Sequence, residues 1–148
     1  MTAKIEVAIV DQNPVVRAGL EALVLKDGRF GVAGVFASGA ALIEFLHRKP
    51  LEIAIVGWSL PDMQAGELLD RIKREKLKTR VIIYTGERSS DVLRHAIKGG
   101  AWGFVSKMEE PPVLLEAVPA RSPALAVMYD LGLLMLRPEA SFHSAETL

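Results

Sequence analysis

Short runs of apolar, often β-branched residues alternate with longer amphipathic segments over most of the chain. The five runs are Ile5–Val10, Phe30–Phe36, Ile53–Val56, Arg80–Tyr84 and Trp102–Val105. Runs this continuously apolar are typical of strands buried on both faces, as in a parallel sheet. This alternation with short connections predicts right-handed crossovers and an open parallel α/β sheet covered by helices on both faces.

Helix signals fill the gaps between these runs and follow the last one. The predicted helices begin at Asn13, Ser38, Ala65, Ser89 or Ser90, and Glu110. Asn13 and Ser38 have side chains that can cap helix amides, and Pro14 suits a first helical turn. Gly99-Gly100 should end the fourth helix, and Pro119 should end the fifth because proline donates no amide hydrogen bond.

The residues after Pro119 have a different character. Ser122-Pro123 favours a new helix over Ala124–Leu136, a segment that is apolar almost all round with Asp130 as its only charge. Such a helix is buried, either on its own domain or against a partner, and we favour a protein–protein interface such as a homodimer. The expected organisation is one domain over residues 1–120, an apolar helix over 121–138 and a flexible tail over 139–148.

The composition is that of a globular protein without a dominant charge. The chain has 148 residues, and its 18 Lys+Arg and 18 Asp+Glu give a formal net charge of +0. A neutral chain has no overall field that draws it onto nucleic acid or a membrane, and neither is expected as a partner. The absence of cysteine excludes thiolate metal sites. Since the sequence shows no membrane helix and no secretion signal, a cytoplasmic protein is expected.

Polar residues follow several of the predicted strands. Asp11 and Gln12 follow the first strand, Gly57 the third, Thr85 the fourth and Lys107 the fifth. Ligands of an open parallel sheet bind beyond the carboxyl ends of its strands, so an acid, a hydroxyl and an ammonium group should converge there. The pattern is compatible with a pocket for a small anion, or for a metal with an anion.

Four stretches carry a resemblance to a known family: Val10–Pro14, Leu60–Met63 with Gly66, Val81–Thr85 and Gly100–Lys107. In this order and spacing they resemble the receiver domain of bacterial response regulators (CheY-like), closest to receivers of NarL/FixJ/LuxR-type regulators. The resemblance implies a (βα)5 flavodoxin-like three-layer sandwich with strand order 2-1-3-4-5. It also implies two-component phosphorelay signal transduction, with a histidine kinase or another signalling protein as partner.

In that family, two acids after the first strand and an aspartate ending the third hold Mg²⁺, and the aspartate accepts a phosphoryl group. By resemblance, Asp11 corresponds to the first acid, Thr85 and Lys107 to the phosphoryl-binding hydroxyl and lysine, and Phe104 to the switch aromatic. Trp102 lies near the surface that the family uses for dimerisation and output, although a core position is an equal alternative.

Two positions depart from the family pattern. Gln12 stands in place of the second acid, and Gly57 stands in place of the phosphoacceptor. Glycine has no side chain and forms no acyl phosphate. Neither neighbouring candidate is convincing, because Asp62 is better interpreted as a turn residue and Ser59 lacks an adjacent base. With Asp11 as the only predicted carboxylate, Mg²⁺ binding is expected to be weak or absent, and no other cofactor is implied.

The role of the altered pocket stays open at this point. The simpler interpretation is an ion pair between Asp11 and Lys107; the alternative is a small-anion site beside Gly57 with Lys107 and Thr85 as donors. Trp58 either caps this pocket or covers the sheet edge. The three histidines, His47, His95 and His143, have no metal-ligand spacing and are expected at the surface.

The favoured hypothesis is an atypical receiver, a pseudo-receiver that signals by protein–protein contact without aspartyl phosphorylation. The alternative is the receiver part of a LuxR/NarL-type transcription regulator whose helix-turn-helix domain is not in this chain, since no basic helix follows Val118. An enzyme is not expected, because the sequence has no Ser-His-Asp set and no P-loop. The sequence identifies neither signal, partner nor output.

Overall fold

The computed structural model describes residues 4–86, 89–106, 125–129 and 132–136. Strands and helices alternate along the first part of the chain. They are β1 (Ile5–Val10), α1 (Pro14–Lys26), β2 (Phe30–Phe36), α2 (Gly39–Arg48), β3 (Ile53–Val56), α3 (Ala65–Arg74), β4 (Arg80–Thr85), α4 (Ser90–Lys98) and β5 (Gly103–Ser106). The expected fifth helix lies outside the described residues.

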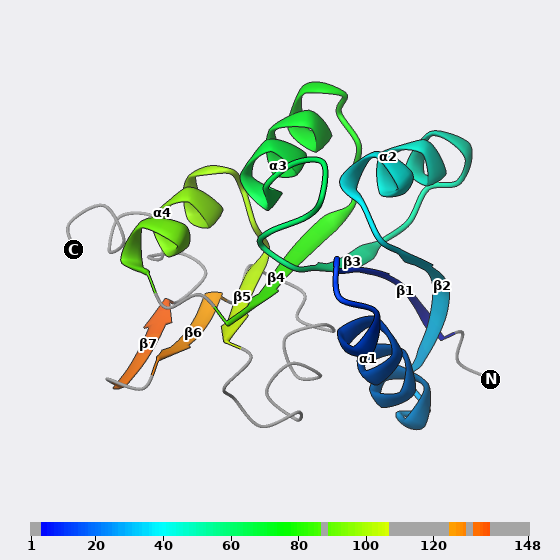
Figure 1. The fold of residues 1–148 in the computed structure, drawn as a ribbon, viewed down its shortest axis with the longest axis horizontal. Coiled ribbons are helices and arrows are strands. Elements are labelled where there is room, and N and C mark those ends of the chain that lie inside the picture. Colours follow the sequence, from blue (N-terminus) through cyan, green and yellow to red (C-terminus); the bar gives the residue numbers. More distant parts are fainter. Residues whose placement is uncertain (1–3, 87–88, 107–124, 130–131, 137–148) are drawn as a thin grey trace.

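The five strands form one parallel sheet in the order β2-β1-β3-β4-β5 (Figure 1). This confirms the predicted fold class and strand order. The central strand β3 is fully buried over Ile53–Val56, as expected for a strand covered on both faces. Its in-register pairing with β1 and β4 brings the carboxyl ends of these three strands to one edge of the sheet.

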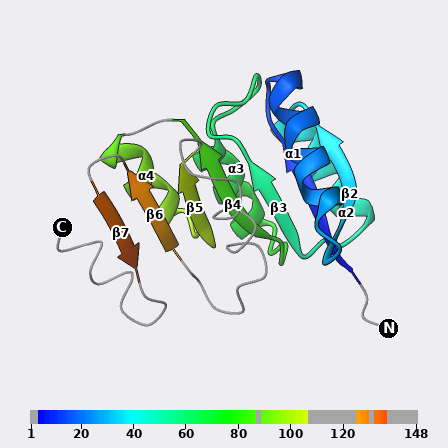
Figure 2. The same cartoon turned by 90° about the horizontal axis from the view of Figure 1, so that it is seen from below.

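Helices cover both faces of the sheet. On one face α1 packs through Leu20 and Val24 against β-strand residues such as Ile9 and Ile55. On the other face α2, α3 and α4 enclose a larger cluster that includes Leu42, Leu68, Ile83, Ala96 and Phe104. Figure 2 shows α1 on the side of the sheet opposite to α3 and α4.

The predicted helix caps are confirmed. Asn13 Oδ1 accepts a hydrogen bond from Val15 N at 2.8 Å, and Ser38 Oγ accepts one from Ala41 N at 3.2 Å. Ser89 caps α4 through Asp91 N at 3.0 Å, and the chain leaves α4 through Gly99 and Gly100. None of the helices within the described ranges has the length and apolar character that a bilayer crossing requires.

The apolar helix predicted over Ala124–Leu136 is wrong, because strands occupy this segment. β6 (Leu125–Tyr129) and β7 (Gly132–Leu136) pair antiparallel, and β6 lies beside β5 (Figure 2). A short continuous apolar run does not by itself distinguish a buried strand from a buried helix. Gly132 is unfavourable in a helix interior by about 1 kcal/mol relative to alanine, and here it is the first residue of β7.

Candidate functional site

Three residues stand in one row at the carboxyl edge of the sheet. Val10, Val56 and Ile83 are register partners on β1, β3 and β4. The next residue of each strand is Asp11, Gly57 or Tyr84, respectively. Neighbouring strands alternate side chains in step, so this row brings Asp11 and Tyr84 to either side of a residue with no side chain.

The carboxylate of Asp11 occupies the space that a side chain on Gly57 would need. A Cβ placed on Gly57 would lie 2.4 Å from Asp11 Oδ2 and 3.1 Å from Asp11 Cγ. Asp11 is 3% exposed, and its Oδ1 accepts a hydrogen bond from Asn13 N at 2.9 Å. Arg17 Nη1 donates to the Asp11 carbonyl at 2.8 Å. An acidic group thus reaches the space beside Gly57, but it comes from the end of β1 and is enclosed.

The negative charge of Asp11 affects the pKa of Tyr84, which lies on the other side of Gly57 in this row. Burial raises the pKa of the half-buried Tyr84 hydroxyl above its ordinary value of 10.0, and the negative charge of Asp11 raises it further. The phenol therefore stays protonated throughout the physiological range. Tyr84 could not be singled out from the sequence, because it precedes Thr85, the residue that matches the family pattern, and only the strand register places it beside Gly57.

The other residues of the predicted pocket are only partly brought together. Thr85 is buried and pairs with Ser106 in the β4–β5 ladder, whereas Gln12 is exposed. Lys107 lies outside the described residues, so both interpretations of the pocket, the Asp11–Lys107 ion pair and the anion site, stay predictions.

The two aromatic residues predicted for a switch or output face differ in their surroundings. Phe104 is fully buried in the cluster under α2, α3 and α4. Trp102 is half-buried and directly precedes β5, and the Arg80 guanidinium lies 4.8 Å from the centre of its ring. Arg80 also pairs with Glu52. Trp102 thus belongs to a cation–π contact at the amino edge of the sheet, opposite to Asp11 and Gly57.

The Mg²⁺ implied by the resemblance finds a poor set of ligands in the described residues. Asp11 supplies a single carboxylate, and one of its oxygens already accepts the Asn13 amide. Gln12 adds at most a neutral oxygen. In the part of the chain that the structure describes, no three His, Asp or Glu side chains gather as a metal site would require. These residues do not fit a divalent-cation site of the usual kind.

The Asp62 carboxylate forms hydrogen bonds with α2, away from Gly57. Its Oδ1 accepts a hydrogen bond from Gly39 N at 3.0 Å, and its Oδ2 accepts one from Ala40 N at 2.9 Å. Desolvation opposes ionisation, but hydrogen bonds from the amides of Ala40 and Gly39 outweigh it and hold the pKa of Asp62 below its ordinary 3.8. The carboxylate therefore caps the N-terminus of α2 from the β3–α3 loop, which is more than the turn residue predicted from sequence.

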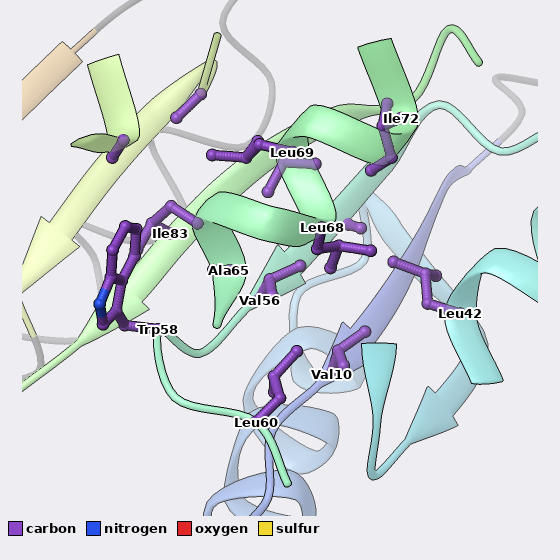
Figure 3. Close-up of a cluster of buried hydrophobic side chains, with 14 of the residues drawn as sticks. Val10, Leu42, Val56, Trp58, Leu60, Ala65, Leu68, Leu69, Ile72 and Ile83 are labelled. Atoms are coloured by element: carbon purple, nitrogen blue, oxygen red, sulfur yellow. The ribbon is translucent and has the colours of Figure 1, made fainter. Parts of the chain in front are cut away.

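The rest of the β3–α3 loop packs against the face of the sheet that carries α2, α3 and α4. A Cβ on Gly39 would lie 2.6 Å from Met63 Sδ, so the methionine covers the first residue of α2. Trp58 and Leu60 are buried, and Ser59 bridges to Gln64. Figure 3 shows Trp58 at the edge of the buried cluster, on the side away from Leu42. Trp58 is therefore a core residue of the α2, α3 and α4 face.

His95 of α4 stacks against Trp58. Their ring centroids are 6.4 Å apart and the rings are inclined by 16°. Together they line a groove of about 500 Å³ between α3 and α4. His95 and His47 are exposed, as predicted, and His47 pairs with Glu75; His143 lies outside the described residues. No sequence spacing links residue 58 to residue 95, so the pair could not have been found before the fold.

Comparisons with known proteins agree with this architecture. The response regulator receiver domain family matches residues 7–119. A probable transcriptional regulatory protein, SgaR of Hyphomicrobium methylovorum, is 68% identical over 118 residues, which cover 80% of this chain and 56% of that protein. A putative transcriptional regulator of Pseudomonas aeruginosa is 32% identical over 115 residues, covering 78% of this chain and 55% of that protein. This chain spans about half the length of these relatives.

Solved structures share the fold. The signal receiver domain of the putative response regulator NarL from Mycobacterium tuberculosis superimposes with a TM-score of 0.72 at 24% identity. The match covers 78% of this chain and 98% of that domain. The likeness shows a common arrangement of sheet and helices.

Proposed function

This chain belongs to the response regulator receiver domain family, and from that premise we propose that it signals without aspartyl phosphorylation. In this proposal it presents a surface to a protein partner, and the contact itself carries the signal. Thr85 and Phe104 then serve as parts of a fixed core rather than as a phosphoryl-responsive switch. The observation that carries the proposal is Gly57, whose position has no nucleophile and whose side-chain space holds the Asp11 carboxylate.

Two further observations support the proposal. Asp62, the nearest acid downstream of Gly57, is held by two amides of α2 and is therefore not available as a substitute acceptor. Among the described residues this edge also offers a single carboxylate, Asp11, where the family pattern has three acids, and one of its oxygens already accepts the Asn13 amide.

The test is incubation of the chain with acetyl phosphate and Mg²⁺, followed by intact-mass measurement. We expect no gain of a phosphoryl group, while a receiver with an aspartate at this position, treated in parallel, gains one. The Asp11→Asn variant is included because Asp11 is the acid that lies beside Gly57. A stable mass gain that disappears in Asp11→Asn would identify Asp11 as the acceptor and overturn the proposal.

We also propose that the chain is the receiver part of a transcription regulator. The favouring observation is the 68% identity to a protein described as a probable transcriptional regulatory protein, of which this chain matches about half the length. The protein isolated from its native cell should then carry a second, DNA-binding domain. A gel shift at moderate salt with the chain alone should show no complex, and a sequence-specific shift by the chain alone would contradict this assignment.

A further inference from the structure

The α3–α4 groove has an aromatic floor. The groove lies between two helices that run side by side (Figure 1) and has a volume of about 500 Å³. Its floor is formed by the exposed His95 ring, which stacks against the buried ring of Trp58. The open face of such a supported ring accepts a flat or apolar side chain well, because aromatic faces bury a large area in a fixed geometry.

Cations collect at one end of this groove. Lys73 and Lys98 line it where α3 and α4 terminate, and both side chains are exposed. Lys73 Nζ donates to the carbonyl of Lys98 at 3.4 Å, which holds the two residues together. Within the described ranges no carboxylate lies within ion-pair distance of either ammonium. A lysine ammonium has three donors, so the bond to one carbonyl leaves Lys73 able to bind an anion.

The sequence that follows the last residue of α3 is also basic. Residues 71–80, Arg-Ile-Lys-Arg-Glu-Lys-Leu-Lys-Thr-Arg, carry six basic residues and one acid, in a chain of net charge +0. Arg71 and Arg74 are matched by Glu75 and Asp70, whereas Lys76 and Lys78 are exposed and follow the last residue of α3. The helix dipole attracts cations only near the last turn. The dipole of α3 therefore explains a lysine at residue 73, in the last turn, better than a lysine at residue 78.

Acids stand at the other end of the groove. Glu67 and Asp70 line it on the N-terminal side of Lys73, and Asp70 is held by Arg74 at 2.8 Å. The groove thus changes from negative to positive along α3. A continuous phosphate backbone would meet repulsion from Glu67, while a peptide can place a cation there and carboxylates at the far end.

We propose that the α3–α4 groove docks an extended segment of a partner protein that is acidic at one end and basic at the other. The acidic end lies against Lys73 and Lys98, an apolar side chain lies over His95, and the basic end lies beside Glu67. The surface differs from Asp11 and Gly57 in location and chemistry, so this inference holds whether or not the chain is phosphorylated.

The test uses the tryptophan in the groove as its reporter. Trp102→Phe leaves Trp58 as the only tryptophan, since the chain has two. The probe is the acetylated peptide Lys-Ala-Leu-Ala-Glu-Glu, titrated at low and high salt, and its reversed-charge counterpart Glu-Ala-Leu-Ala-Lys-Lys is the control. We expect a saturable change in Trp58 emission with the first peptide, weaker at high salt because the contacts are exposed, and a much smaller response to the second.

Charge-reversal variants locate the site. Lys73→Glu with Lys98→Glu should weaken binding of the first peptide by about tenfold or more, corresponding to about 1.4 kcal/mol. Lys4→Glu with Lys26→Glu, which makes the same change in net charge at exposed residues of other segments, should leave binding unchanged. Circular dichroism confirms that both variants are folded. Absence of saturable binding, equal loss in the two variants, or tighter binding of a short DNA duplex would each overturn the proposal.

Discussion

At the scale of single residues, the contact between Gly57 and Asp11 is the most informative feature of the carboxyl edge. Glycine at residue 57 lets a buried carboxylate from the neighbouring strand use the free space. The glycine is visible in the sequence, and so is its departure from the family pattern. The direction of the Asp11 side chain is not, because it depends on the Asn13 amide and on the register between β1 and β3.

Gly57→Ala should destabilise the chain by about 1–3 kcal/mol, because the new methyl group overpacks against Asp11 Oδ2. Urea denaturation measures the change in the free energy of unfolding. Gly19→Ala is the matched control, since a Cβ at this position in α1 meets nothing within 4 Å and the substitution should stabilise by about 0.5–1 kcal/mol.

The same clash predicts coupling between the two positions. In an Asp11→Ala background the cost of Gly57→Ala should fall by about 1 kcal/mol or more, because the opposing oxygen is gone. If the cost is the same in both backgrounds, the carboxylate does not occupy the space beside Gly57.

At the scale of secondary-structure elements, the β3–α3 loop is fastened to the N-terminus of α2. Asp62 caps two amides of α2 that lie 22 and 23 residues earlier in the chain. Caps supplied by the helix's own flanking residues, such as Asn13 and Ser38, could be predicted from sequence because their partners are two or three residues away. The Asp62 cap could not, because its partner is fixed only by the tertiary fold.

Asp62→Ala should lower the free energy of unfolding by about 1 kcal/mol at neutral pH, the usual value of a cap. Since the folded-state pKa of Asp62 is lowered, this contribution is complete above its ordinary pKa of 3.8 and is lost as the pH falls through the lowered value. The difference between wild type and variant should therefore narrow in acid.

Chemical denaturation of the Asp62→Ala variant at several pH values measures this difference. Asp70→Ala is the control, because the exposed Asp70–Arg74 pair contributes at most about 0.5 kcal/mol. A pH-independent difference for Asp62→Ala would show that the carboxylate charge is not involved.

The ends of α3 and α4 offer a second comparison. Both helices terminate with the same pair of hydrogen bonds, Leu77 N to Ile72 O and Lys76 N to Lys73 O after α3, and Ala101 N to Ala96 O and Gly100 N to Ile97 O after α4. The residue with positive φ is Gly100 at 89° in one case and Lys76 at 57° in the other. A side chain in this left-handed region costs about 1 kcal/mol, which is why glycine is the usual choice.

Lys76→Gly should therefore raise the free energy of unfolding by about 0.5–1 kcal/mol, while Gly100→Ala should lower it by about 1 kcal/mol. Thermal unfolding of both variants measures the two shifts. Opposite signs are the expected result; destabilisation by both substitutions would mean that the Lys76 side chain stabilises the fold by more than its backbone conformation costs.

At the scale of the whole molecule, the hydrophobic pattern determined most of the fold. The five strands of the parallel sheet and the helices between them could be predicted because their apolar periodicity and their caps agree with each other. The segment Ala124–Leu136 was predicted wrongly because it is apolar without a clear period. Its structure depends on pairing between β6 and β7, which no local rule fixes.

Local unfolding of the sheet should begin at β2, its edge strand. β3 is fully buried, whereas β2 is half-buried over residues 32–36 and, among the described strands, pairs with β1 alone. Hydrogen exchange followed by mass spectrometry should show the slowest amides in β1 and β3, at the rate of global unfolding, and faster exchange in β2. Equal protection in all three strands would show that the sheet opens as a single unit.

The enclosed carboxylate of Asp11 also bears on any attempt to install an acceptor at residue 57. Gly57→Asp would add a carboxylate at the end of β3, where the family pattern places the phosphoacceptor. The new side chain would, however, meet the Asp11 carboxylate, with like charges a few ångströms apart. Such an aspartate fits only if the Asp11 side chain turns away or a cation lies between the two carboxylates.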